Sequence, residues 1–251
     1  MIAGNIRKVK ERIENKCSEI ERDPAGIKLI AVSKNFGIDA IKKAYDEGIR
    51  DFGENRAQEL DIKFSRMPEF VSSKSKAGDS DVSGRNIVWH FIGNLQRNKV
   101  RFAVDCADYI HSVDSLMLAA EINKRAGAVN KIQKVLLQIN TSEEDTKSGL
   151  TNYSEIRDLA GYCNEFPSVE LIGLMTIGPL TNDMELVRKS FTRLRKLKNR
   201  LNGDNFANIK ELSMGMTSDF EIAIEEGATM LRVGSAIFGE RDYSKDWRES
   251  L

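Results

Sequence analysis

The sequence predicts an α/β fold, a single (β/α)8 barrel of the TIM type with an additional helix at the N-terminus. Short runs rich in β-branched residues alternate with segments of helical period, which is typical of parallel strands joined by helical crossovers. About eight such units fit into 251 residues, as expected for this barrel. An open doubly wound sheet is the alternative, but no GxGxxG motif follows the first predicted strand.

The first element is an amphipathic helix, which we place at residues 1–22. Apolar residues recur at steps of three and four along it, and such a stripe packs one helix face onto a core. The sequence Asp23-Pro24 then ends the helix, because proline cannot continue it.

The alternating elements follow in order. Strands are expected at residues 28–33, 50–54, 87–93, 109–113, 134–140, 171–178, 211–215 and 230–239. Helices are expected between them, among others at residues 38–48, 115–127, 153–166, 184–201 and 219–227. Several of these helices end at a glycine, which is the usual residue after a helix C-terminus.

One segment, residues 71–86, breaks this alternation. It is rich in serine, glycine and aspartate and has no apolar period, so we expect a mobile loop between the second helix and the third strand. A lid is the functional interpretation and a plain surface insertion the simpler one. No linker or internal repeat divides the chain, and residues 1–251 are interpreted as one domain.

Composition excludes several classes of function. The 38 basic and 38 acidic residues balance, which gives no electrostatic basis for binding nucleic acid or an anionic membrane. The three cysteines are far apart, which argues for a reducing compartment and against both a disulfide framework and a zinc site. Only two histidines are present, so no metal site is expected. Without a secretory signal or a long apolar run, a cytoplasmic location is expected.

Functional side chains of such a barrel lie at the carboxyl ends of the strands. Lys34 follows the first strand, Asn55 the second, and Met175 closes the sixth. Each also has a structural explanation: a solvated lysine, a helix-capping asparagine and a methionine that fills the core. His90, within the third strand, is interpreted as a core histidine with satisfied hydrogen bonds.

The last two strands end in sequences suited to an anion. Ser213 and Gly215 lie just before a helix, where Ser218 and Glu221 match a capping box. Gly234 and Ser235 form a second turn that carries a hydroxyl group. Because exposed N–H groups at a helix start favour a dianion, a phosphate site is expected here. Together with Lys34, it suggests a phosphorylated aldehyde or ketone, with which lysine forms a Schiff base.

Long motifs of this chain resemble the pyridoxal phosphate (PLP) homeostasis protein family, which is related in fold to the N-terminal barrel of alanine racemase. The similarity runs from the first helix to about residue 243, with the motifs in the same order. They are KLIAVSK, RDFGENRAQEL, WHFIGNLQRNK, QINTSEEDTKSGL, LIGLMTIGP and LSMGMTSDFEIAIEEGATMLRVGSAIFGERDY.

The resemblance implies a role for each matching residue. Lys34 would carry PLP as an internal aldimine, and Asn55 would approach the phenolic oxygen of its ring. Met175 would pack close to the cofactor, and Arg232 would face the pyridine nitrogen. The phosphate would be held by Ser213, Gly234 and Ser235.

The arginine bears on the activity that the resemblance implies. A guanidinium only donates hydrogen bonds, so it favours an unprotonated pyridine nitrogen and makes the ring a weak electron sink. Racemases of this fold also use a tyrosine from an added β-domain, for which this chain has no room. We therefore expect a PLP-binding homeostasis protein without catalytic residues or efficient turnover.

Two alternatives remain open at this point. One is a PLP-dependent amino-acid racemase in which Lys34 and a second group, such as His90, act as bases. The other is a phosphosugar-handling barrel that uses a lysine Schiff base. For the leading interpretation, the expected partners are PLP and PLP-dependent apo-enzymes, and the chain is expected to be a monomer because it lacks the racemase dimerisation domain.

Overall fold

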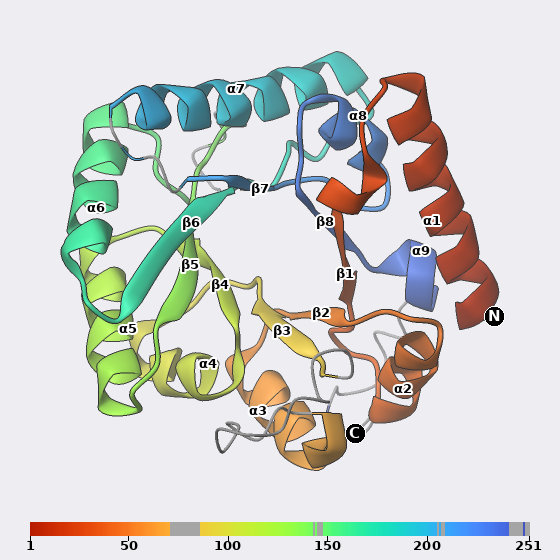
Figure 1. Ribbon diagram of the computed structural model, residues 1–251, viewed down its shortest axis with the longest axis horizontal. Coiled ribbons are helices and arrows are strands. Elements are labelled where there is room, and N and C mark those ends of the chain that lie inside the picture. Colours follow the sequence, from red (N-terminus) through yellow and green to blue (C-terminus); the bar gives the residue numbers. More distant parts are fainter. Residues whose placement is uncertain are drawn as a thin grey trace.

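A computed structural model of the protein describes residues 1–70, 86–142, 144, 148–204, 206, 209–240 and 248. Eight parallel strands form a closed barrel in sequence order, so β8 pairs with β1, and helices surround it (Figure 1). The predicted fold is confirmed. The loop expected at 71–86 lies, except for Asn86, outside the described residues, and its mobility stays a prediction.

The strands are short, as is usual for this barrel. Their bounds are β1 Lys28–Val32, β2 Asp51–Glu54, β3 Val88–Phe91, β4 Tyr109–Val113, β5 Gln133–Gln138, β6 Val169–Met175, β7 Glu211–Ser213 and β8 Met230–Val233.

The helices mostly follow the strands. Their bounds are α1 Ile2–Glu19, α2 Ile38–Asp46, α3 Ala57–Arg66, α4 Val100–Cys106, α5 Leu116–Ala128, α6 Tyr153–Glu165, α7 Met184–Gly203, α8 Phe220–Glu225 and α9 Ser235–Phe238. None of the helices in the described ranges is long and apolar enough to cross a membrane.

The predicted strand at 230–239 is wrong in its second half. The strand ends at Val233, and the residues from Ser235 to Phe238 form α9. A short apolar run fits a buried strand and a buried helix equally well, because a run without polar residues shows no periodicity that would separate the two. The break at Gly234 places a helix start at the carboxyl end of β8.

Alternation along the strands divides the buried side chains into two sets. The larger core lies between strands and helices and includes Ala31 and Leu231. Their neighbours Ile30 and Met230 belong to a separate small cluster with Leu136 and Met175. Because successive side chains of a strand point to opposite faces, this second cluster lies inside the barrel.

The N-terminal helix α1 packs outside the barrel beside α8 and α9 (Figure 1). Its residues Ile6, Val9, Ile13 and Cys17 are buried, which confirms the predicted stripe. The helix ends at Glu19, three residues before the predicted end at 22. The helix therefore covers the outside of the barrel where the first and last strands pair.

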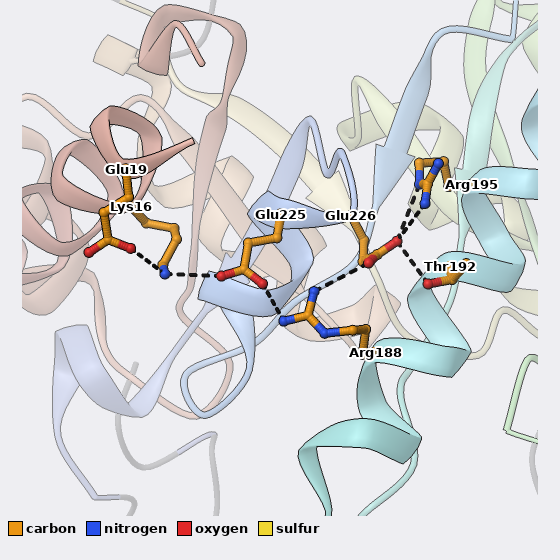
Figure 2. A network of polar contacts seen from close by, with 7 residues as sticks. All are labelled: Lys16, Glu19, Arg188, Thr192, Arg195, Glu225 and Glu226. Atoms are coloured by element: carbon orange, nitrogen blue, oxygen red, sulfur yellow. Dashed lines mark hydrogen bonds and ion pairs between the residues drawn. The ribbon is translucent and has the colours of Figure 1, made fainter. Parts of the chain in front are cut away.

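A chain of surface ion pairs joins α1, α8 and α7 (Figure 2). Lys16 contacts Glu225 at 3.0 Å, and Arg188 bridges Glu225 and Glu226. Arg195 completes the chain with a 2.9 Å contact to Glu226. Hydrogen bonds from Arg188 and Lys16 hold the pKa of Glu225 below its ordinary value. The network thus ties the additional helix to the last helices of the barrel.

Candidate functional site

A cavity of about 290 Å³ lies at the carboxyl ends of the strands. Five of the seven residues predicted from the sequence line it, namely Lys34, Asn55, Arg232, Gly234 and Ser235. A second hollow of about 310 Å³ shares Lys34 and Asn55 and extends over the ends of β3 and β5. Residues from β1, β2 and β8, far apart in the sequence, therefore meet around one space.

Lys34 lies in a turn directly after β1, and a buried polar cluster supports this turn from below. The Nζ of Lys63 donates to the carbonyl of Ser33 at 2.9 Å. It also donates to Glu54 at 2.8 Å and to Glu59 at 2.7 Å. Glu59 in turn accepts from the backbone N–H of Asn35 at 2.7 Å. Both neighbours of Lys34 are therefore tied to one buried lysine and its two carboxylates.

The geometry of this cluster follows from local structure. Glu59 and Lys63 are four residues apart on α3 and so share one face of that helix. Glu54 ends β2 and also accepts from the Ser33 hydroxyl at 2.6 Å. Burial raises the pKa of Glu54, and the charge of Lys63 opposes that rise.

Asn55 follows the end of β2 and lines the cavity. Among the residues that the structure describes, none donates a hydrogen bond to its buried Oδ1. The backbone of Gly93 passes so close that a Cβ there would lie 2.1 Å from the carbonyl oxygen of Asn55. Glycine is therefore required at this position.

Arg232 reaches the cavity from β8 and is almost fully buried. Its Nη1 donates to the Ser213 hydroxyl at 2.6 Å and its Nη2 to the Thr176 carbonyl at 2.7 Å. Burial lowers the pKa of Arg232 to about 10, and the negative charge of Asp219 partly opposes this fall. The guanidinium is held in one plane and remains a donor at neutral pH.

The turn after β8 faces the loop after β7. The hydroxyl of Ser235 donates to that of Thr217 at 3.2 Å, and both residues line the cavity. Gly215 precedes this loop with a φ of 92°, a conformation that favours glycine. The predicted capping box at Ser218 is wrong, because α8 begins at Phe220 after Asp219. Asp219 instead accepts from a backbone N–H within its own loop.

Two predicted residues do not line the cavity. Ser213 is fully buried and bonds to both Arg232 and His111, so it lies beneath the arginine. Met175 is 1% exposed and packs in the cluster inside the barrel. Their contacts with a phosphate and a cofactor stay predictions. His90 is buried and hydrogen-bonded on both ring nitrogens, and it does not line the cavity.

Sequence reasoning missed several residues of the site. Ile92 and Ile177 line both hollows, and each follows the end of a strand, a signal that could have found them. Lys63 was missed because its partners Ser33 and Glu54 come from other elements. The spacing of Glu59 and Lys63 indicates only a surface pair, since burial cannot be read from it.

The family model of the alanine racemase N-terminal domain matches residues 2–242. A pyridoxal phosphate homeostasis protein of Aquifex aeolicus is 38% identical over 238 residues, which are 95% of this chain and 97% of that protein. The protein of that name from Mus musculus is 40% identical over 250 residues, 96% of this chain and 87% of the relative.

The chain belongs to the pyridoxal phosphate homeostasis protein family. Among solved structures, PipY of Synechococcus elongatus with PLP bound has a TM-score of 0.78 and 33% identity, covering 95% of this chain and all of that one. An alanine racemase of Clostridium difficile has a TM-score of 0.68 at 16% identity, and this chain covers 63% of its length. That likeness shows a common fold only. The members of the pyridoxal phosphate homeostasis protein family match over nearly their whole length.

Proposed function

We propose that this protein binds PLP in the cavity at the carboxyl ends of the strands and serves PLP homeostasis, holding the cofactor without efficient turnover. One observation carries the proposal. A lysine, an amide whose oxygen has no partner among the described residues, a fixed arginine and a glycine-serine turn line one cavity. The names of the relatives and the PLP bound to PipY support it.

PLP supplies an aldehyde to which a lysine amine can be attached covalently. Lys34 provides that amine, and the cluster around Lys63 fixes the turn that carries it. Asn55 provides an amide for the phenolic oxygen of the ring. The Nδ2 group of that amide is the donor for this contact, because the amide oxygen only accepts.

The opposite end of the cavity suits a phosphate. Gly234 is buried at the turn, and the hydroxyls of Ser235 and Thr217 lie at its mouth. We assign the phosphate to this group. Because Ser213 accepts a hydrogen bond from Arg232, we assign Ser213 the role of supporting the guanidinium. We assign Met175 to the floor beneath the cavity.

Arg232 explains why turnover is expected to be weak. It donates only, so it can stabilise a pyridine nitrogen that lacks a proton. Such a ring withdraws little electron density from a bound substrate. Because His90 is buried away from the cavity, it is not placed to act as a second base. Both features favour holding PLP over racemisation.

We further propose that the protein acts in the cytoplasm as a monomer that passes PLP to apo-enzymes. Apolar side chains beside the cavity support such a contact. Ile177, which lines the cavity, is 42% exposed, and Leu180 is 97% exposed in the same loop. A partner enzyme that covers the cavity would bury these two side chains on contact.

Borohydride reduction followed by peptide mass mapping tests the proposal. We expect one adduct, on Lys34, and none in Lys34→Ala. An adduct on another side chain, or a protein that takes up no PLP, contradicts it. Incubating the PLP-loaded protein with single enantiomers of amino acids tests the lack of turnover. Rapid racemisation that disappears in Lys34→Ala would show an enzyme instead.

A further inference from the structure

A chain of hydrogen bonds crosses the barrel interior from one end to the other. At the amino end, the Oδ1 of Asp51 on β2 lies 2.9 Å from Nε2 of His90 on β3. Nδ1 of His90 lies 2.9 Å from Nε2 of His111 on β4, and Nδ1 of His111 lies 2.9 Å from the Ser213 hydroxyl. Ser213 then accepts from Arg232 at 2.6 Å. The chain therefore ends at the residue proposed to face the cofactor ring.

The two ends of this chain favour one direction for every bond. An ionised carboxylate such as Asp51 only accepts, so His90 carries a proton on Nε2. Arg232 only donates, so Ser213 accepts from it and keeps its single hydroxyl proton available for Nδ1 of His111. The remaining bond then runs from Nε2–H of His111 to Nδ1 of His90. Both imidazoles are consequently neutral and protonated on Nε2.

The surroundings of His111 agree with a neutral ring. Both histidines are fully buried, and burial lowers the pKa of His111 well below its ordinary value, with the charges of Arg232 and Lys28 acting in the same direction. Tyr109 of β4 stacks on His90 with ring centroids 4.6 Å apart.

Other charged groups face the amino end of the chain. Lys134 of β5 lies 5.4 Å from the centre of the Tyr109 ring. Burial raises the pKa of Tyr109, the charge of Lys28 on β1 opposes that rise, and the charge of Glu211 on β7 adds to it. Asp51, Lys28 and Glu211 all line a hollow of about 530 Å³ at the amino ends of the strands. Asp219, beyond β7, is the acidic group that acts on Arg232 at the other end.

We propose that His90 and His111 are positioning residues that hold Arg232 through Ser213, and that Asp51 is the terminal acceptor which fixes their tautomers. The inference rests on the proposed function, in which Arg232 faces the ring of bound PLP. Because each hydrogen bond in such a chain polarises the next, the Asp51 carboxylate strengthens the hydrogen bond that Ser213 accepts from the guanidinium. A group at one mouth of the barrel thereby influences cofactor binding at the other.

The first test uses the cofactor-free protein and no variant. The chain has only two histidines, so heteronuclear NMR of the imidazole nitrogens gives one set of signals for each. We expect both rings to be protonated on Nε2 alone, and the buried His111 ring to stay neutral around pH 6.5, the ordinary value for histidine. A ring protonated on Nδ1 in the cofactor-free protein overturns the proposal.

The second test compares two carboxylates at the same end of the barrel. Asp51→Ala removes the terminal acceptor, whereas Glu211→Ala removes an equal charge from the same hollow but outside the chain. We expect Asp51→Ala to weaken PLP binding about twofold to fivefold and to change the absorption spectrum of bound PLP. Glu211→Ala should change neither. Equal effects of both variants, or none of Asp51→Ala, contradict the proposal.

The two tests separate this inference from the proposed function. If the protein takes up no PLP, the proposed function fails, while the NMR result still decides whether the tautomers are fixed. If PLP binds to Lys34 but either ring is protonated on Nδ1, the positioning role fails and the proposed function stands. If Asp51→Ala does not fold, the measurement on the unaltered protein still decides.

Discussion

Replacing Lys63 with methionine tests how much the buried cluster beneath the Lys34 turn contributes to stability. Methionine has a similar length and is apolar, so Lys63→Met keeps most of the packing and removes the charge. The side chains of Lys63, Glu54 and Glu59 are all 0% exposed. The variant leaves Glu54 without a cation, Glu59 with only the half-exposed Arg56 at 3.8 Å, and the Ser33 carbonyl without its donor.

Breaking a buried ion pair by removing one partner costs about 3–5 kcal/mol, because the remaining charge stays buried. In a chain of this length, 1 kcal/mol changes Tm by about 2–4 °C, so Tm should fall by roughly 6–20 °C. The loss should be smaller at acid pH. Burial already raises the pKa of Glu54, and without Lys63 this carboxylate binds a proton more readily in the folded state.

Urea unfolding followed by circular dichroism at two pH values measures the effect. The matched control is Lys16→Met, because Lys16 also contacts two glutamates, Glu19 and Glu225, but with a side chain 21% exposed (Figure 2). Surface pairs of this kind contribute less than about 1 kcal/mol. If Lys63→Met is no more destabilising than Lys16→Met, the buried cluster does not support the turn energetically.

Three further predictions concern other parts of the structure. Gly93→Ala pushes a Cβ against the Asn55 carbonyl, so we expect the free energy of unfolding to fall by about 1–3 kcal/mol. PLP binding, measured by fluorescence titration, should also weaken, and unchanged binding contradicts the close approach. All three cysteines are buried and free, and burial raises the pKa of Cys106 and Cys163 to about 12, so a thiol reagent should label them only in denaturant. The lowered pKa of Glu225 means that its pairs stabilise the fold above the ordinary value of 4.5 and that this contribution is lost as pH falls through the lower folded value. On acidification, the rate of amide hydrogen exchange in α1 should therefore rise more in the unaltered protein than in Glu225→Gln. An equal rise in both proteins would show that the Glu225 ion pairs do not stabilise α1.

The fold was largely predictable because strand and helix periods alternate so regularly. Errors arose where one pattern fits two structures, as in the run after Arg232, where the strand gives way to α9 at Gly234. The boundary of α1 was three residues too long because Ile20 continues the apolar stripe. This residue is 37% exposed in the structure, so periodicity alone overstates the buried face.

The candidate site was predictable only in part. The rule that strand ends carry function found Lys34, Asn55 and Arg232, which do line one cavity. The same rule could not tell that Ser213 lies beneath the arginine, because that depends on the direction of one side chain inside the barrel. The partners of His90 were equally hidden, since they come from β2 and β4 and meet it only in the closed sheet.

The closed barrel limits how another protein can recognise this one. In the part of the chain that the structure describes, every strand has a neighbour on both sides, so the backbone offers no free row of N–H and C=O groups for an added strand. Recognition must then rely on helix surfaces and on the loops around the mouth. An enzyme that accepts the cofactor would therefore be selected by the side chains of those helices and loops, and the barrel strands would take no direct part in the contact.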